Sequence, residues 1–415
     1  MTRRAIRVAA IWLALGSCMP IEDPTLQPVP VPSPETIQPA IRIGLATSAA
    51  EVELSGPTGL ALIDPDEGLL EQIDAGEAVT VVARGERVTL TGRSATRSRR
   101  LLRVESTSQG GVVEIDGRPY RGAVELDRGA DGVRIVNVVG LEDYLVGVVS
   151  AELGARRPDE RAAAMAQAVV ARTYALRNRG RWEADGFDLL AGVASQVYRG
   201  AGTEDSISRA AVEATAGEVL MYGDDLIDAF YSSTCGGHTE DGSAVFAGAN
   251  RPYLQARPDI DPSGRAWCAI SPRFRWSRRW TGRELETVLR HTLAAEGLST
   301  ARATDLREVR VLSRTPAGHI ATLELVGLQG RTTVRGAAIR RVLAPPAGGI
   351  LESTDFTVRI GRTGGRIERV DVDGQGFGHG VGLCQWGAIG RARAGQGYGE
   401  ILLSYFPGTD LRRIY

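Results

Sequence analysis

The sequence predicts an α+β fold that begins with a β-rich region. From Ile41 to Val139 the chain is a series of short runs with strand-like alternation, separated by glycine and aspartate. From Leu141 onward, runs with helical spacing mix with strand-like runs, without the regular alternation of a parallel βαβ sheet. No internal repeat stands out. We therefore predict a β-rich N-terminal region over 41–123, followed by a mixed α+β domain over 124–415.

The N-terminus carries the pattern of an export signal. A basic segment precedes an apolar run, Val8–Leu15, which is too short to span a bilayer and ends in small residues directly before Cys18. This pattern resembles a bacterial lipobox and predicts a lipoprotein signal over 1–18, with Cys18 lipidated. The alternative is an ordinary signal peptide that contains Cys18. Either way, we expect an exported protein in a compartment that permits disulfides.

Residues 19–40 are rich in proline and lack an apolar face, which predicts an extended tether between a membrane and the folded region. Met19 follows the predicted lipidation site, where an aspartate would indicate inner-membrane retention in a Gram-negative cell. We therefore expect a lipid anchor at the periplasmic face of the outer membrane.

The charge of the chain excludes two classes of function. The formal net charge is -1, whereas a nucleic-acid-binding domain is normally basic, so we expect no nucleic-acid partner. The sequence contains no lysine, which excludes Schiff-base and lysine-nucleophile mechanisms.

Two helices are predicted after the β-rich region. Leu141, Tyr144, Leu145 and Val148 have amphipathic spacing, and Pro158 opens a longer helix that Gly180 ends. Glu152 lies between these two segments, where spacing alone indicates a solvated loop acid. No second carboxylate stands at a motif spacing from it, so a glycosidase with two carboxylates cannot be read from the sequence.

Arg172 falls within the apolar stripe of the longer helix. A guanidinium in that position must be paired or must face a cleft, because an unpaired buried charge is unfavourable. One interpretation is a structural ion pair with Asp143 or Glu142. The other is contact with an anion or a sugar near Glu152.

The stretch FYSSTCGGHTEDG places Cys235 and His238 around a Gly-Gly turn, and Cys268 and Cys384 are the other cysteines beyond Cys18. Three interpretations stay open for this set. Cys235 and Cys268 form a disulfide, the four side chains bind a structural zinc ion, or the thiols are free. A metallohydrolase would rest on these residues alone, since no His-Glu-x-x-His motif is present.

The stretch GQGFGHGVGLCQWG is dense in glycine without the offsets of a dinucleotide-binding loop. Its glycines allow close approach of the backbone around His379. They expose that imidazole together with Gln385 and Trp386, and polar groups beside an aromatic ring suit a sugar, although Trp386 equally suits a core.

Three separated stretches together resemble the SpoIID/LytB family of bacterial cell-wall proteins. They are GLEDYLVGVVSAELG followed by AMAQAVVARTYAL, then FYSSTCGGHTED, and then GFGHGVGLCQWGAIGRARAGQGYGEILLSYFPGTDL. The resemblance covers roughly residues 124 to 411, with the three motifs in the same order. It implies a SpoIID-like catalytic domain with a substrate groove.

The resemblance also implies a function and a set of site residues. Family members studied as enzymes are lytic transglycosylases that cut peptidoglycan glycan strands with one glutamate as acid and base. The family glutamate corresponds to Glu152. The other motif positions imply substrate contacts at Arg172, Gln167, Ser233, Thr234, His379 and Gln385. No cofactor is required for this reaction, and the zinc that some members carry would be structural here, near Cys235 and His238.

One position departs from the family pattern. The family has Glu-Met-Pro where this chain has Glu152-Leu153-Gly154, and glycine in place of proline is expected to loosen the backbone beside the catalytic position. Other family members stimulate cell-wall amidases. A non-catalytic, wall-binding lipoprotein that stimulates an N-acetylmuramoyl-L-alanine amidase is therefore the alternative to the enzyme.

Overall fold

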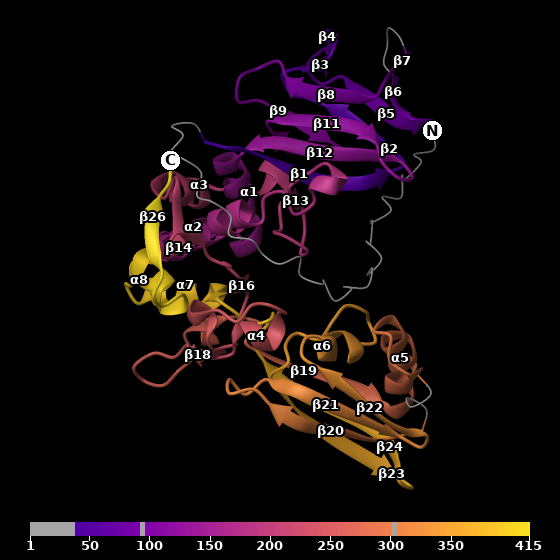
Figure 1. Ribbon diagram of the computed structural model, residues 1–415, viewed down its shortest axis with the longest axis vertical. Coiled ribbons are helices and arrows are strands. Elements are labelled where there is room, and N and C mark those ends of the chain that lie inside the picture. The colour runs from indigo at the N-terminus through magenta and orange to yellow at the C-terminus, as the bar shows by residue number, and fades with distance from the viewer. Residues whose placement is uncertain (1–37, 92–95, 301–304) are drawn as a thin grey trace, which may run out of the picture. The chain divides into compact units, whose positions relative to one another are not determined.

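The computed structural model describes residues 38–91, 96–300 and 305–415, and its elements form an α+β fold as predicted (Figure 1). The predicted signal over 1–18, with Cys18, and most of the predicted tether lie outside the described residues. Among the helices of the described residues, none is long and apolar enough to cross a membrane.

The described residues form two compact units, which differ from the predicted boundaries. The main unit contains residues 38–239, Pro252–Ser271 and Gly380–Tyr415. The inserted unit contains Glu240–Arg251 and Pro272–His379. The predicted division at residue 123 is not a boundary between these units, because strands on both sides of it pair in one sheet.

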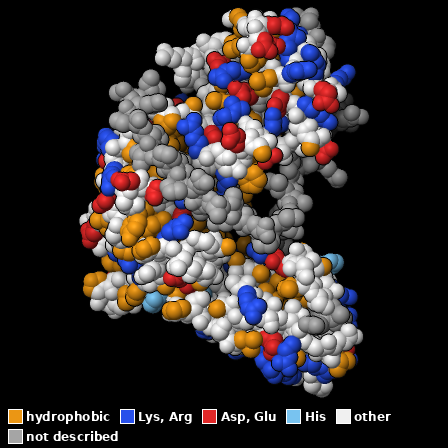
Figure 2. Space-filling model, viewed as in Figure 1, with side chains coloured by type: hydrophobic (Ala, Val, Ile, Leu, Met, Phe, Trp, Pro, Cys, Tyr) orange, Lys and Arg blue, Asp and Glu red, His pale blue; other side chains and the backbone are white. Residues whose placement is uncertain are grey.

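The predicted β-rich region forms most of two sheets of the main unit, whose strands pair antiparallel except for β13, which pairs in parallel with β1. In the described residues one sheet has the order β13-β1-β12-β11-β8-β3-β4 and the other the order β10-β9-β2-β5-β6-β7. The strands are β1 Ala40–Ala49, β2 Glu51–Ser55, β3 Leu60–Asp64, β4 Gly68–Ile73, β5 Ala78–Arg84, β6 Arg87–Thr91, β7 Thr96–Arg99, β8 Leu101–Ser106, β9 Val112–Ile115, β10 Arg118–Arg121, β11 Ala123–Arg128, β12 Val133–Gly140 and β13 Leu189–Leu190. Arginine and acidic side chains are interspersed over these sheets on the face shown in Figure 2.

The first helices of the main unit come after β12. They are α1 Leu141–Leu153, the 3₁₀ turn η1 Pro158–Glu160, α2 Arg161–Arg177, and α3 Ser206–Ala214. The helix predicted from Pro158 is confirmed, and Gly180 beyond its end has a φ of +77°. From Ala166 to Leu176 every residue of α2 is buried, rather than one stripe, because α1, α3, α7, α8 and β14 all pack against it.

The remaining elements of the main unit are short. They are η2 Glu183–Asp185, η3 Gly200–Thr203, β14 Glu218–Tyr222, β15 Asp225–Leu226, β16 Tyr231–Ser232, β17 His238–Thr239, η4 Pro252–Leu254, β18 Arg257–Pro258, η5 Trp267–Ile270, β25 Leu383–Cys384, α7 Gln385–Arg393, α8 Tyr398–Tyr405 and β26 Asp410–Arg413. The C-terminal strand β26 pairs with β14 and is an edge strand of the three-stranded sheet β15-β14-β26. Strand β14 of this sheet packs against α2.

The inserted unit has its own hydrophobic core. Its elements are α4 Gly242–Val245, β19 Arg275–Thr281, α5 Gly282–Ala295, β20 Leu306–Arg314, β21 Ile320–Gly327, β22 Gly330–Arg335, α6 Ala338–Val342, β23 Phe356–Thr363 and β24 Arg366–Gln375. Trp280, Leu285, Leu289 and Leu323 are fully buried in that core. A turn at Gly364 and Gly365, both at positive φ, joins β23 to β24.

Candidate active site and thiol cluster

Three motifs that are far apart in the sequence converge in the main unit. Strands β16 and β25 pair in parallel, which places Tyr231 opposite Leu383. The backbone N–H of Trp386 donates to the carbonyl of Ser233 over 3.0 Å, and α2 packs against both α1 and α7. Residues from the first, second and third motifs therefore meet around the end of α1.

Glu152 lies in the last turn of α1, not in a loop as its spacing suggested. The helix continues through Leu153, and the N–H of Gly154 donates to the carbonyl of Ser150 over 2.9 Å. The side chain of Glu152 is half-buried. A helical position holds the carboxyl group more rigidly than a solvated loop would.

The carboxyl group of Glu152 is held by neutral donors. Its Oε1 accepts from the N–H of Val197 over 2.9 Å and from the Tyr231 hydroxyl over 3.0 Å. Its Oε2 accepts from Nε2 of Gln385 over 3.3 Å. Within the described part of the chain, no ion pair involves Glu152 and none of its hydrogen-bond partners is a carboxylate.

A second layer of polar groups orients these donors. Nε2 of Gln196 reaches the Tyr231 hydroxyl over 3.4 Å, and Oε1 of Gln196 accepts from the Tyr144 hydroxyl over 3.2 Å. Burial raises the pKa of Tyr231 well above its ordinary value, with the neighbouring Glu152 charge adding to the effect. The Tyr231 hydroxyl therefore keeps its proton and donates a hydrogen bond to Oε1 of Glu152.

Gly154 has a specific backbone conformation rather than a loosened one. Its φ is +67° and its ψ is -173°, a region that side-chain-bearing residues rarely adopt and that the ring of proline excludes. The chain then turns so that Nε of Arg156 donates to the carbonyl of Gly154 over 3.3 Å. The Arg156 guanidinium lies 5.5 Å from the ring centre of Trp386. Glycine at this position therefore permits a backbone conformation that proline could not adopt.

Arg172 forms the ion pair that was one of its two interpretations. Its side chain is fully buried, and its Nε and Nη2 donate to the Glu142 carboxylate over 2.8 Å and 2.6 Å. Glu142 is in the first turn of α1, ten residues before Glu152, which corresponds to about 15 Å along a helix. The structure therefore places Arg172 at the opposite end of α1 from the carboxyl group of Glu152.

The other predicted substrate contacts lie in three places. Gln167 is buried, and its Oε1 accepts from Nε2 of Gln385 over 3.5 Å, so these two glutamines lie with Glu152. Thr234 is also buried, and its hydroxyl pairs with Ser271 over 3.1 Å and with Ser233 over 3.3 Å. His379 belongs to the inserted unit, where its ring packs edge-on against Phe246 with centres 5.1 Å apart.

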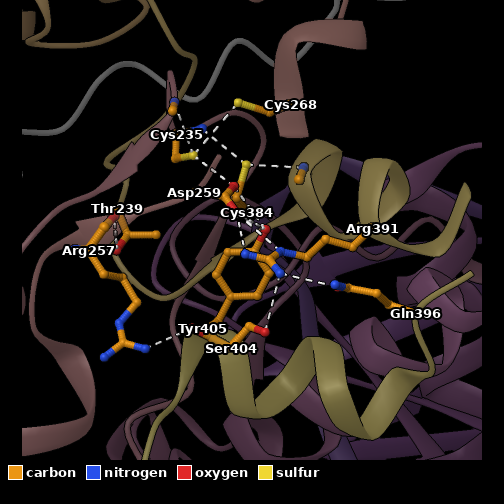
Figure 3. Close-up of polar contacts among 12 residues, drawn as sticks. Cys235, Thr239, Arg257, Asp259, Cys268, Cys384, Arg391, Gln396, Ser404 and Tyr405 are labelled. Carbon is orange, nitrogen blue, oxygen red and sulfur yellow. Dashed lines mark hydrogen bonds and ion pairs between the residues drawn. The ribbon is translucent and has the colours of Figure 1, made fainter. Parts of the chain in front are cut away.

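The three described cysteines form one buried cluster with an acid that the sequence did not indicate (Figure 3). The ligand atoms of Cys235, Asp259, Cys268 and Cys384 all lie within 4.8 Å of one another. His238 is exposed on β17 and is not part of this group. The predicted membership of His238 is therefore corrected to Asp259.

No disulfide joins the described cysteines. All three are free, and Sγ of Cys235 lies 3.7 Å from Sγ of Cys268, so the predicted Cys235–Cys268 disulfide is not formed. Hydrogen bonds from Cys235, from Cys384 and from the backbone of the Gly-Gly turn lower the pKa of the Cys268 thiol to about 4. Burial raises the pKa of the Cys235 and Cys384 thiols.

Some site residues carried little signal in the sequence. Tyr231 stands inside the FYSSTCGG motif, so an aromatic hydroxyl beside that turn was visible, but its partner was not. Gln196 and Val197 lie outside the three motifs. Asp259 lies two residues before another acid, Asp261, and only the fold brings Asp259 to the cysteines.

A surface depression of about 680 Å³ lies elsewhere in the main unit. Its lining includes Arg42, Arg179, Phe187 and Asp188. None of the residues predicted for the active site lines it.

Comparisons with known proteins agree with the convergent motifs. The family profile described as Stage II sporulation protein, SpoIID, matches residues 129–222, which include α1 and α2. A profile described as a domain of unknown function matches residues 268–382, which cover most of the inserted unit.

Three relatives align with most of the chain. The Stage II sporulation protein D of Bacillus subtilis is 30% identical over 291 residues, covering 66% of this chain and 75% of the relative. An uncharacterized protein of Brachyspira hyodysenteriae is 29% identical over 301 residues, covering 72% of this chain and 73% of the relative. The Amidase enhancer of Bacillus subtilis is 29% identical over 345 residues, covering 75% of this chain and 46% of the relative. The alignment thus spans less than half of the Amidase enhancer.

The fold and the site define an α+β protein in which one glutamate of the first motif is held by neutral donors from the second and third motifs and from Val197. Together with these similarities, they place the chain in a known family. The chain belongs to the SpoIID family.

Proposed function

We propose that this protein is a lytic transglycosylase that cleaves the glycan strands of peptidoglycan, with Glu152 as its single acid and base. Membership of the SpoIID family supports a role at the cell wall. The observation that carries the proposal is the environment of Glu152, whose carboxyl group meets three neutral donors and no second carboxylate among its partners.

The reaction needs one carboxyl group that gives and takes a proton. Protonated Glu152 donates its proton to the glycosidic oxygen as the bond to the muramoyl anomeric carbon breaks. The resulting carboxylate then takes the proton of the muramoyl 6-hydroxyl, whose oxygen bonds to the anomeric carbon. The products are a 1,6-anhydromuramoyl end and a free hydroxyl on the leaving sugar, and the carboxyl group is again protonated. The substrate's own hydroxyl replaces an activated water.

The hydrogen bonds of Glu152 divide its two oxygens between two tasks. Oε1 accepts two short hydrogen bonds, from Val197 and Tyr231, which orient the carboxyl group. Oε2 accepts one longer bond, from Gln385, and has remaining lone-pair capacity. We therefore assign Oε2 as the oxygen that exchanges the proton with the substrate.

Gln167 and Gln385 are the proposed substrate-binding residues nearest this carboxyl group. Nε2 of Gln167 is buried without a hydrogen-bond partner among the described residues, so a donor is available there. Trp386 is half-buried beside Gln385 and supplies an aromatic face on which a sugar ring can pack. Ser233, Thr234 and His379 remain proposed contacts through their motif positions.

The proposed location follows from the predicted signal. An exported chain, held by a lipid on Cys18 at the periplasmic face of the outer membrane, would meet its glycan substrate in the periplasm. Growth with labelled fatty acid tests the anchor: the wild-type chain should take up label, and a Cys18→Ala chain should not. Label at the wild-type level in Cys18→Ala would contradict lipidation at that residue.

The test of the proposed reaction is product analysis. Purified full chain is incubated with glycan strands, and the products are separated and identified by mass spectrometry. Wild-type protein should release fragments that end in anhydromuramic acid, and Glu152→Gln protein should release almost none. Undiminished anhydro products from Glu152→Gln would show that Glu152 is not the acid and base.

A second candidate function is stimulation of a cell-wall amidase without glycan cleavage. The similarity to the Amidase enhancer favours it. This candidate predicts that wild-type protein releases no anhydro products, yet increases the rate at which an N-acetylmuramoyl-L-alanine amidase releases stem peptides from the same wall. Retention of that stimulation in Glu152→Gln, with no glycan cleavage by either protein, would select the second candidate.

A further inference from the structure

The thiol cluster joins segments that are distant in the sequence. Cys235 follows β16, Asp259 follows β18, Cys268 is in η5, and Cys384 ends β25. All four side chains are at most 2% exposed. Figure 3 shows the three sulfur atoms turned toward one another, with the Asp259 carboxylate beside them. The convergence of three thiols and one carboxylate from four separate segments is the arrangement expected of a metal site.

The spacing of the cluster fits a tetrahedral metal ion. Zinc–sulfur bonds of about 2.3 Å at a tetrahedral angle separate two sulfurs by about 3.8 Å. Sγ of Cys235 and Sγ of Cys268 are 3.7 Å apart. Oδ2 of Asp259 lies 3.2 Å from Sγ of Cys235, close to the sulfur–oxygen separation of about 3.6 Å that bonds of this kind produce.

We propose that Cys235, Cys268, Cys384 and Asp259 bind one structural zinc ion, with the Asp259 carboxylate as the fourth ligand instead of the His238 imidazole. Three thiolates and one carboxylate are a ligand set that zinc accepts. The set is closed, because four protein ligands complete a tetrahedron and leave no position for a substrate. The three thiol protons pass to solvent when the ion binds.

The surroundings of Asp259 suit a carboxylate ligand. Its Oδ1 accepts from Nε and Nη2 of Arg391 over 3.2 Å and 3.0 Å, and the Tyr405 hydroxyl lies 3.0 Å from both of its oxygens. These bonds leave Oδ2 directed at Cys235 and fix the carboxylate plane. The Arg391 charge also offsets part of the negative charge of a site with four anionic ligands.

Backbone donors orient two of the sulfurs. Sγ of Cys384 accepts from the N–H of Cys235 over 3.1 Å and from the N–H of Gly387 over 3.3 Å. Sγ of Cys235 accepts from the N–H of Gly237 over 3.5 Å. Amide donors to metal-bound sulfur are a usual part of zinc–thiolate sites, and here they come from the Gly-Gly turn and from the start of α7.

The ion would fix the segments that carry part of the Glu152 site. Cys384 is directly followed by Gln385, which donates to Glu152, and Cys235 lies four residues after Tyr231, which also donates to Glu152. A metal ion bound by both Cys235 and Cys384 would therefore fix the positions of Tyr231 and Gln385 relative to each other. The metal site itself does not depend on the reaction proposed for Glu152.

The experiment measures metal binding by the full chain. Protein purified under reducing conditions is saturated with Zn²⁺ and dialysed, and its zinc content is measured by elemental analysis. We expect about one zinc ion per chain in the wild type and in His238→Ala, and none in Cys268→Ser or Cys384→Ser. We expect Asp259→Asn to lower zinc affinity by about 100-fold, and Tyr405→Phe by about tenfold, as for loss of a supporting hydrogen bond.

Cobalt substitution keeps the test decisive where a variant fails to fold. Co²⁺ bound by the wild type and by His238→Ala should show intense sulfur-to-cobalt absorption and the visible bands of a tetrahedral site. In a folded Asp259→Asn chain the visible bands should shift while the sulfur absorption persists. Circular dichroism of each variant identifies those that are unfolded.

Three results would overturn the proposal. The first is a folded, reduced wild-type chain that retains no zinc. The second is loss of zinc in His238→Ala with full retention in Asp259→Asn. The third is a Cys235–Cys268 disulfide, found by mass as the loss of two hydrogens, in protein purified without reductant from its own compartment.

Discussion

Helix α1 carries a carboxylate in its first turn and another in its last turn, and their environments are opposite. Glu142 is bound by the buried guanidinium of Arg172 and by the Tyr415 hydroxyl. Glu152 meets only neutral donors, from Val197, Tyr231 and Gln385. A cation stabilises the charged form of the carboxylate that it pairs with. Protonation of a carboxyl group that is held by neutral groups breaks no ion pair. One helix thus supplies both a structural carboxylate and the proposed catalytic one.

Replacement of the second carboxylate should have the largest effect on activity. We expect Glu152→Gln to reduce the rate of anhydro-product release by about 10²–10⁴-fold, the usual contribution of a general acid or base. Its melting temperature should stay close to that of the wild type, because an amide oxygen can still accept from Val197 and Tyr231. The matched control is Glu213→Gln at an exposed position of α3, which should keep full activity. Equal rates of product release for Glu152→Gln and Glu213→Gln would show that the reaction does not require Glu152.

Breaking the ion pair should affect stability instead. Arg172→Ala leaves the Glu142 carboxylate without its cation, which we expect to lower the free energy of unfolding by about 3–5 kcal/mol. Urea unfolding followed by circular dichroism measures this loss. The activity per folded molecule should remain near that of the wild type, because Glu142 lies at the opposite end of α1 from Glu152. A normal stability combined with a raised KM would instead assign Arg172 to substrate binding.

The family proline should not fit at the end of α1. Gly154→Pro removes the N–H that donates to Ser150 and requires a negative φ where the chain has +67°. We expect a loss of about 2–4 kcal/mol from the missing hydrogen bond and the backbone strain together. Gly154→Ala keeps the N–H and should lose only about 1–2 kcal/mol. If Gly154→Pro were as stable as the wild type, the path of the chain after Glu152 would be different from the one described.

The smallest effect should come from one of the neutral donors. Tyr231→Phe removes a single hydrogen bond to the Glu152 carboxyl group, which we expect to slow product release by about tenfold, equivalent to about 1.4 kcal/mol. The stability should change by less than it does in Arg172→Ala. A Tyr231→Phe enzyme as fast as the wild type would show that Val197 alone orients Oε1.

Local structure was predictable where the pattern was local. The strands of 41–139, the existence of helices α1 and α2, and the β23–β24 turn follow from alternation, helical spacing and glycine positions. The three motifs indicated the family and, through the resemblance, Glu152 as the proposed acid and base. These features depend on residues within a few positions of each other in the chain.

Long-range pairing was not predictable in the same way. The parallel contact of β16 with β25 joins Tyr231 to Leu383, and nothing in either segment specifies the other. The same holds for Asp259, which only the fold brings to the cysteines in place of His238. The inserted unit also interrupts a region that reads as one domain, because its boundaries carry no distinct composition. The sequence predicts a loosened backbone at Gly154, because a positive φ is not visible in a sequence.

The most direct test of the central claim is the fate of water during the reaction. Glycan strands are digested by wild-type protein in water enriched in heavy oxygen, and the new chain ends are weighed by mass spectrometry. We expect ends that are lighter than hydrolysed ends by one water and that carry no heavy oxygen, and we expect these ends to be lost in Glu152→Gln. New reducing ends that carry heavy oxygen, or unlabelled anhydro ends formed equally well by Glu152→Gln, would contradict the central claim.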